Sequence, residues 1–396
     1  MAIVVSQNAA GNPGSGMQID VSGDSNMGIA RAGQQPIHAA LIPRGNRAFV
    51  ANTDGTVTAF SPASFFGPIG TPVTVSLPSG LTPQFLYSTE SGTMYALATN
   101  DGTFSQCVAS AVVAIDLISS VVTKTACVGP DAGLQKRALT ETPDGRKIYV
   151  VNGDGTVSSI NTVDFSTNPP VSPAALNPAL TTPVSLVASL DNSRVFVLDA
   201  SGLIWTITTF NDQATAVTTN AATGGANFIF LEASRNRLYT TSSSSNTVAI
   251  FDAAATVPQT VAVPLTLPLG STPVMITALP DGSRVYVLSS TATGAFVTAI
   301  NALSERITGT IALPGATANP NAVPICQAAR YPLSMAAAGD SHRLYVADCV
   351  AGSTNIIDTT KNSLVLSLKS PTSAYSPVGS ATYPPPQNPV WVVAGP

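Results

Sequence analysis

Seven copies of a four-strand sequence repeat predict an all-β protein, a seven-bladed β-propeller of four-stranded antiparallel blades. The copies share a turn, a basic residue and an aromatic-Val strand. Within the strand-like segments apolar residues alternate with period two, and 31 prolines and 30 glycines would repeatedly break helices. One four-stranded blade cannot bury both of its faces, so the seven repeats are expected to stack into a ring.

The repeat is most regular around its second strand. The clearest copies span residues 36–60, 138–161 and 273–287. The seven second strands begin at residues 47, 93, 147, 194, 237, 284 and 343, at intervals of 46, 54, 47, 43, 47 and 59 residues. In the sixth copy, four strands are expected at residues 274–279, 284–289, 296–301 and 307–313.

The end of the second strand resembles a known family. Two copies end this strand with the segments Tyr149-Val150-Val151-Asn152 and Phe49-Val50-Ala51-Asn52, and in both copies Gly-Thr-Val comes shortly afterwards. The first segment is preceded by Pro-Asp-Gly-Arg. This pattern resembles the YVTN-type β-propeller repeat over residues 36–368. The resemblance implies an envelope or extracellular setting, because the family includes surface-layer proteins, exported binding propellers and relatives of propeller lactonases. The second repeat departs most, with Thr93 where the other six carry Arg or Lys.

The repeats divide the chain into an N-terminal arm (1–35), the propeller (36–368) and a Pro-rich C-terminal arm (369–396). Both arms contain uncharged strand-like segments, which pair either with the outer edge of a blade in the same chain or with a neighbouring copy. If the arms pair with a neighbouring copy, the partners of this chain are other copies of itself. Under this prediction, removing either arm leaves seven complete blades. The residues predicted to mediate this self-association are Ala2, Ile3, Val4, Val5, Val390, Trp391, Val392 and Val393.

Composition limits the partners and the location. Only 10% of residues are charged, and the net charge is −4. The sequence contains no run of Lys or Arg, so we do not expect it to bind nucleic acid. No stretch reaches the roughly 18 apolar residues of a membrane span, so no membrane insertion is expected. The first residues lack the features of a signal peptide, so the chain is either cytoplasmic or given without its leader.

Four cysteines favour an oxidising location. Their spacing suggests two local disulfides, Cys107 with Cys127 and Cys326 with Cys349, although four buried free thiols are the alternative. Disulfides are typical of proteins outside the cytoplasm. We therefore expect an extracellular, cell-surface or periplasmic protein.

Residues suited to catalysis are few. The chain has two histidines and four glutamates and lacks the common zinc, haem, nucleotide and hydrolase motifs. We expect no catalytic residue, no cofactor and no metal. His38, in the first strand of the first repeat, is interpreted as a packed or water-bonded residue of the central channel rather than a ligand or general base. The repeated Asp-Gly pairs are interpreted as hairpin turns rather than calcium loops.

One ring of cations is also predicted, because six repeats carry a basic residue at the same position. Such a ring either binds an anionic polymer or packs the aliphatic parts of its side chains over the blade edges. Acidic residues in the adjacent turns neutralise much of the positive charge, which favours the second interpretation. The six residues are Arg47, Lys147, Arg194, Arg237, Arg284 and Arg343.

These observations favour a non-catalytic extracellular or cell-envelope propeller, a structural or interaction module that self-assembles into a layer or filament through its terminal arms. The alternative is an exported lactonase-like propeller enzyme, or a module that binds a small ligand or glycan at the channel mouth. The sequence does not identify the ligand.

Overall fold

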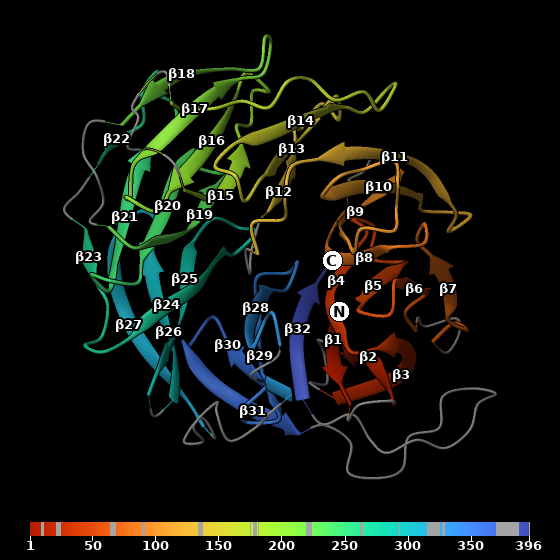
Figure 1. The fold of residues 1–396 in the computed structure, drawn as a ribbon. Coiled ribbons are helices and arrows are strands. Elements are labelled where there is room, and N and C mark those ends of the chain that lie inside the picture. The colour runs from red at the N-terminus through yellow and green to blue at the C-terminus, as the bar shows by residue number, and fades with distance from the viewer. Residues whose placement is uncertain are drawn as a thin grey trace.

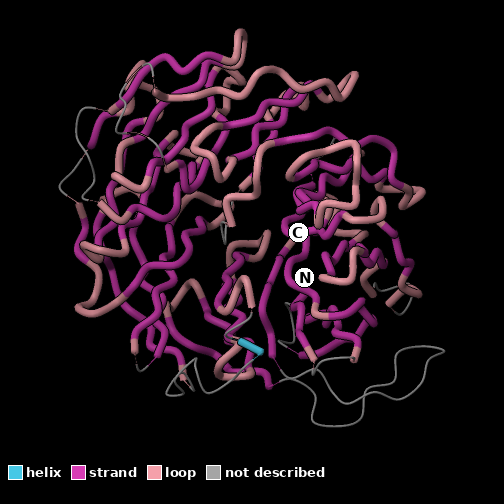
Figure 2. The backbone as a smooth tube through the Cα atoms, in the orientation of Figure 1, coloured by secondary structure: helices cyan, strands magenta, loops and turns pink. Residues whose placement is uncertain are grey.

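Eight β-sheets are arranged in a ring in the computed structural model of the chain (Figure 1). Almost all of the described backbone is strand or loop (Figure 2). The structure describes residues 1–395 except for 9–11, 21–24, 64–68, 89–91, 134–137, 175, 177–179, 181, 219–223, 262–263, 293, 315–324, 327–328 and 370–387. Within these ranges no helix is long and apolar enough to cross a membrane.

Blades 1 to 7 follow one another along the chain, and within each blade consecutive strands pair antiparallel, innermost strand first. In blade 3, isolated bridges to Thr167 and Val171 stand where the other blades have a fourth strand. The strands of blades 1 to 4 are β4 (Pro36–Leu41), β5 (Ala48–Asn52), β6 (Thr56–Phe60), β7 (Val73–Ser76), β8 (Leu81–Ser88), β9 (Thr93–Asn100), β10 (Ser110–Asp116), β11 (Val122–Val128), β12 (Leu139–Glu141), β13 (Lys147–Val151), β14 (Val157–Asn161), β15 (Pro183–Ala188), β16 (Arg194–Asp199), β17 (Ile204–Thr208) and β18 (Gln213–Val217). Those of blades 5 to 7 are β19 (Ala226–Glu232), β20 (Arg237–Ser242), β21 (Thr247–Asp252), β22 (Gln259–Thr260), β23 (Leu265–Thr266), β24 (Thr272–Ala278), β25 (Arg284–Thr291), β26 (Gly294–Asn301), β27 (Arg306–Leu313), β28 (Leu333–Ala337), β29 (Arg343–Asp348), β30 (Ser353–Asp358) and β31 (Ser363–Lys369).

The prediction of seven blades with two additional arms is wrong in its blade count, because the two ends of the chain together build an eighth blade. The arms pair with each other and not with the outer edge of another blade. Strands β1 (Ala2–Gln7), β2 (Pro13–Asp20) and β3 (Ser25–Gln34) come from the N-terminal arm, and β32 (Asn388–Ala394) comes from the C-terminal arm. The sheet order is β3-β2-β1-β32, so β32 is the innermost strand and the ring closes between the two ends of the chain. The Pro-rich run at 383–386 lies outside the described residues.

The break in the eighth blade explains why the repeat pattern misses it. The two chain ends meet between its first and second strands, where the Gly395 N–H donates to the Met1 carbonyl at 3.0 Å. The other blades carry a turn at this place, and all of them except blade 2 carry the basic residue of the repeat just after it. Blade 8 therefore has four strands without the segment that makes the repeat recognisable in the sequence.

The residues predicted to mediate self-association lie in the strands of this blade, and all except the partly buried Val393 are buried. Val4 is opposite Val392, Ala2 is opposite Ala394, and strand β1 has a partner on both edges. One face of the blade packs toward blade 1 and the other toward Tyr345 and Ala347 of blade 7. Their backbone groups are thus used within the chain, and a neighbouring copy pairs with them only if the blade opens.

Both predicted disulfides are present, Cys107 with Cys127 and Cys326 with Cys349. They indicate an oxidising compartment outside the cytoplasm. The first joins the loop between strands β9 and β10 to the end of β11, and the second joins the segment that precedes β28 to the end of β29.

Candidate functional site

A cavity of about 330 Å³ lies between the innermost strands of blades 1, 2, 5, 6, 7 and 8. Most side chains that line it are aromatic or apolar. It extends to the carboxyl ends of these strands, as far as Ser88, Thr277, Ala337 and Ala394. No Asp, Glu, Lys or Arg is among the described residues that line it. The large side chains are Phe85, Tyr87, Phe228, Phe230, Met275, Met335 and Trp391.

A recurring irregularity of the innermost strands positions several of these side chains. The pairing of first and second strands shifts by one residue at the same place in five blades, and in four of them the shift follows a proline. Proline tolerates the first positions of a strand, and a bulge redirects the next side chain. The residues that resume pairing after the shift are His38, Phe85, Ser185, Phe228 and Met275, of which all but Ser185 line the cavity.

His38 is buried at the wall of the cavity, with 2% of its surface exposed, which places it in the channel as the repeat predicts. Its ring centroid lies 4.1 Å from that of Trp391, 4.4 Å from that of Phe85 and 5.4 Å from that of Tyr331. The Trp391 Nε1–H donates to the Ala39 carbonyl at 3.0 Å, so the eighth blade is joined to the first beside this histidine.

The hydrogen bonds of His38 determine its tautomer. The Leu86 backbone N–H donates to His38 Nδ1 at 3.2 Å, so Nδ1 carries no proton. Burial, and secondarily the Arg330 cation, hold the pKa of His38 well below its usual value. The neutral ring must then carry its proton on Nε2, and this buried atom has no hydrogen-bond partner among the described residues.

A partly buried ion pair joins Arg330, which precedes β28, to Asp131, and it also contacts Gln84 of β8. Arg330 donates to both carboxylate oxygens of Asp131, at 2.9 and 3.2 Å, and to Gln84 Oε1 at 2.6 Å. The Tyr331 hydroxyl donates to the Gln84 carbonyl at 3.2 Å, and burial raises the pKa of this hydroxyl. The sequence analysis did not identify this cluster, because Arg330 lies outside the repeat pattern. Its position between Cys326 and the first strand of blade 7 could have indicated that it lies near the channel.

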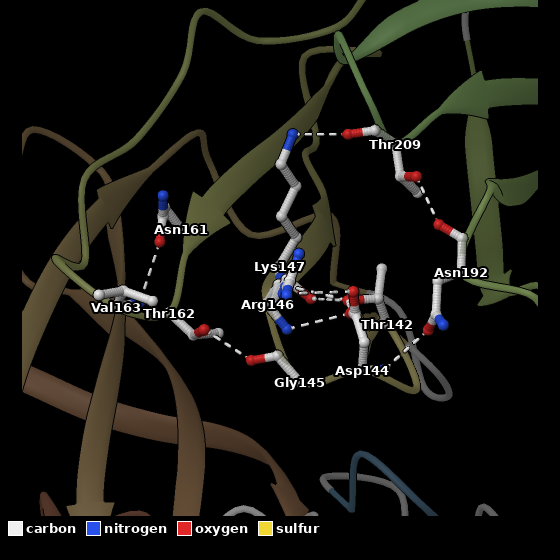
Figure 3. A network of polar contacts seen from close by, with 10 residues as sticks. All are labelled: Thr142, Asp144, Gly145, Arg146, Lys147, Asn161, Thr162, Val163, Asn192 and Thr209. Atoms are coloured by element: carbon white, nitrogen blue, oxygen red, sulfur yellow. Dashed lines mark hydrogen bonds and ion pairs between the residues drawn. The ribbon is translucent and has the colours of Figure 1, made fainter.

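The basic residues of the repeat join neighbouring blades instead of forming a free cationic ring. Arg47 donates to Ser120 Oγ of blade 2 at 2.6 Å, and Lys147 contacts Asp212 of blade 4 at 2.8 Å. Arg194, Arg237 and Arg284 reach blades 5, 6 and 7 in the same way, whereas Arg343 pairs with Asp358 of its own blade. Figure 3 shows the junction of blades 3 and 4, where Lys147 reaches the Thr209 carbonyl.

Blade 2 lacks the repeat cation and uses another. Its Thr93 takes the place of Arg or Lys, and Lys124 of strand β11 donates to the Val163 carbonyl of blade 3 at 2.6 Å. The contact between blades is thus kept although the sequence pattern is lost. We therefore interpret the cations as structural.

A larger hollow, of about 730 Å³, lies on the surface at the junction of blades 3 and 4. Its one carboxylate, Asp212, already accepts hydrogen bonds from Lys147, Tyr149, Ser159 and Asn168. The carboxylate of this groove is already engaged, whereas the smaller central cavity is lined mainly by aromatic and apolar side chains, as ligand sites typically are. The central cavity is therefore the stronger candidate site.

Asp348 is expected to destabilise the protein at neutral pH, because burial raises the pKa of its carboxyl group. Its Oδ1 accepts from the Ala351 N–H at 3.0 Å, but its Oδ2 has no hydrogen-bond partner among the described residues. The raised pKa means that the folded state holds the proton more tightly than the unfolded state. Stability is then lost as pH rises above the unfolded value of about 4. Asp348→Asn should raise the melting temperature at pH 7.

The advantage of Asp348→Asn should disappear as the pH falls below about 4, where the wild-type carboxyl is protonated in both states. Melting followed by circular dichroism between these pH values tests this. Asp358→Asn is the matched control, because hydrogen bonds from Thr360 lower the pKa of that carboxyl and the substitution should destabilise at pH 7. Equal effects of Asp348→Asn at both pH values would contradict the prediction.

The chain is thus an eight-bladed β-propeller with a closed ring and an aromatic cavity in its channel. No family model and no curated protein matches it. Among solved structures it is similar to the dihydro-haem d1 dehydrogenase NirN in complex with DHE (TM-score 0.66, 11% identity), over 98% of this chain and 74% of that one. It is also similar to apo AztD from Citrobacter koseri (TM-score 0.61, 12% identity), over 99% and 96% of the two chains. Both are β-propeller proteins, and at these identities the likeness supports the fold alone.

Proposed function

We propose that this chain is a non-catalytic propeller of an extracellular or cell-envelope compartment, and that it acts as an interaction module by binding a small molecule in its central cavity. The observation that carries the proposal is the cavity of about 330 Å³ lined by aromatic and apolar side chains. Ligand sites are typically concave, apolar and supplied with a few directed polar groups, at volumes of roughly 300 to 1,000 Å³. The two disulfides support the location.

The state of His38 favours binding over hydrolysis. Among the described residues that line the cavity, His38 is the one candidate for a general base. A lactonase-like site needs a base that accepts a proton near the substrate, whereas His38 already carries its proton on the nitrogen without a partner. His38 is therefore not available as a general base, and the cavity suits binding rather than hydrolysis.

A neutral aromatic probe tests this proposal. Naphthalene is expected to bind and to change the fluorescence of Trp391, which lines the cavity, while Trp205 is buried in blade 4. Ala337→Trp should fill the cavity and abolish binding. Ala254→Trp, on an exposed turn of blade 5, is the control and should bind as the wild type does. No binding to the wild type, or equal binding to Ala337→Trp, would contradict a ligand site in the channel.

Self-assembly through the terminal strands is a second candidate function, in the form of strand exchange. Strand β32 is the only one of blade 8 that comes from the C-terminal end, and 18 residues separate it from β31. If β32 of one copy enters blade 8 of the next, each Val4 and Val392 contact is retained between chains. In this proposal the eight predicted residues form the contact between copies, and repeated exchange would link the copies into a layer or filament.

Strand exchange predicts a specific cross-link. Val4→Cys and Val392→Cys place two thiols at directly opposed positions of β1 and β32. In a solution of assembled copies, the oxidised double variant should run as covalent dimers and longer chains in denaturing electrophoresis. The contrary outcome is a product that is cross-linked only within single chains, although light scattering detects assemblies at the same concentration. That result would show that the assemblies use another surface.

A further inference from the structure

We infer that the surface groove at the junction of blades 3 and 4 binds a neutral oligosaccharide of β-1,4-linked pyranose rings, and that one of these rings packs on Phe210. The inference goes beyond the proposed function, because it concerns a second site with a different ligand. It is carried by the interruption of blade 3 beside the groove, the charge balance of the groove wall and the side chains exposed along it.

Two consecutive prolines lie in one wall of the groove. Pro169 and Pro170 fall between the isolated bridges that Thr167 and Val171 make to strand β14, and neither proline has an N–H with which to continue a strand. Blade 3 therefore offers an irregular segment, and not a fourth strand, opposite the start of β18 in blade 4.

The size of the groove suits a chain of sugar rings. Its volume of about 730 Å³ is roughly five times the 150 Å³ of an apolar cavity that holds one benzene molecule. It also lies within the range of about 300 to 1,000 Å³ that is typical of ligand sites. Two or more pyranose rings fit in this volume, and a longer chain can extend along the surface beyond it.

The charged groups of the groove neutralise each other. Lys147 and Asp212 are the two charged residues among the described residues that line it, and Lys147 Nζ lies 2.8 Å from Asp212 Oδ2. Asp212 also accepts hydrogen bonds from Tyr149, Ser159 and Asn168. A charged ligand that left water for this groove would lack an unpaired opposite charge, whereas a neutral polar ligand does not need one.

Exposed amide groups offer hydrogen bonds of the kind that sugars make. Asn168, Asn211 and Gln213 are exposed and line the groove. Asn168 Nδ2 donates to Asp212 at 2.6 Å and to Ser159 at 3.3 Å, which leaves its Oδ1 as an acceptor for a ligand. Asn211 Nδ2 donates to Gln213 Oε1 at 3.3 Å, which leaves the Gln213 Nε2 hydrogens as donors. A sugar hydroxyl both donates and accepts, so it matches such a wall.

Phe210 supplies an apolar face for the ligand. It is 93% exposed, and it is the one exposed aromatic side chain in the part of the chain that the structure describes. The face of an aromatic ring carries partial negative charge, and the axial C–H groups of a pyranose with equatorial hydroxyls form a flat patch that packs on such a face. Because β-1,4 linkage keeps successive rings extended, a chain of such rings can reach Phe210 and the amide groups together.

Saturation-transfer difference NMR with cellotetraose tests the inference. In this measurement the sugar protons closest to the protein receive most magnetisation, so the axial protons of one ring face should respond most strongly. Phe210→Ala should weaken binding about three- to tenfold, the range expected for loss of one aromatic contact, and Phe210→Trp should retain it. Sorbitol, which has hydroxyl groups but no ring, should not compete with cellotetraose at the same concentration.

Two controls separate this groove from other surfaces. Leu303→Ala is the matched control, because Leu303 is 79% exposed and lies two residues after the third strand of blade 6, as Phe210 does in blade 4. This variant should bind cellotetraose as the wild type does. Ala337→Trp, which fills the central cavity, should also bind cellotetraose normally, and Phe210→Ala should still bind naphthalene.

The outcomes for the two sites are distinguishable. No binding of cellotetraose to the wild type, or equal binding to Phe210→Ala, would overturn the inference while the proposed function stands. Cellotetraose binding that is lost in Ala337→Trp and retained in Phe210→Ala would place the sugar in the channel, which also overturns it. If naphthalene does not bind but cellotetraose binds as described, the proposed function fails and the inference stands.

Discussion

Deletion of residues 388–396 is expected to unfold most of the propeller at temperatures where the wild type is fully folded. The deletion removes strand β32, the innermost strand of blade 8, and leaves β1 with an unpaired edge. It also removes the buried side chains of Val390, Trp391 and Val392. Burial of a large apolar side chain is worth roughly 1.5 to 3 kcal/mol, so the loss amounts to roughly 5 to 9 kcal/mol, comparable to the whole stability of many domains.

This expectation reverses the one drawn from seven complete blades, which would survive loss of the C-terminal arm. Urea unfolding followed by circular dichroism measures the difference between the full-length and truncated chains. A synthetic peptide with the sequence of residues 388–396, added in excess, should restore part of the stability, and a scrambled peptide should not. A truncated chain that unfolds at nearly the same urea concentration as the full-length chain would show that blade 8 contributes little to ring closure.

Arg330→Met is expected to destabilise the protein by about 3 to 5 kcal/mol, because it leaves the carboxylate of Asp131 buried without its cation. The two side chains are only 13% and 10% exposed, so water does not replace the lost partner easily. The variant also frees Gln84 Oε1, which accepts from the same guanidinium. Urea unfolding at neutral pH checks the size of the effect.

The double variant Arg330→Met, Asp131→Leu tests the cause of that loss. If the uncompensated carboxylate is responsible, the double variant should recover most of the stability, since removing both charges of a buried pair is often nearly neutral. Arg146→Met is the matched control, because its side chain is 81% exposed and its contact with Asp144 is long, at 3.8 Å. A double variant as unstable as Arg330→Met alone would indicate lost packing rather than an unpaired charge.

The repeat pattern was sufficient to predict seven of the eight blades and their antiparallel strands, and the spacing of the cysteines suggested both disulfides. Alternating apolar residues and tight turns depend on only a few neighbouring residues. The turn before the second strand takes a positive φ at Gly in some blades and at Asn192 and Ser341 in blades 4 and 7. In the sixth blade, for example, the second strand begins at Arg284 and the third ends at Asn301 as predicted. Gly145 and Gly282, in two of the predicted Asp-Gly turns, have the positive φ angles that favour glycine there.

Part of the candidate site was also visible in the sequence. His38 was placed in the first strand of the first repeat and assigned to the central channel, and it lines the cavity. The tautomer of His38 was not predictable, because it depends on the Leu86 N–H of the neighbouring blade. The Arg330 and Asp131 pair was equally hidden, since its members are 199 residues apart and lie outside the repeat.

The sequence by itself therefore determined what is local and repeated: the strand period, the hairpin turns, the cysteine pairs and the seven blades that they define. Only the tertiary structure decided how the ring closes, because β1 and β32 belong to opposite ends of the chain and neither carries the pattern of a blade. The sequence of two short uncharged strands is the same whether they pair within one chain or between two chains, so it does not distinguish these arrangements. Burial of Val4 and Val392 between blades 1 and 7 makes the pairing within the chain the stable one, and the same closure brings Trp391 beside His38 to complete the wall of the cavity.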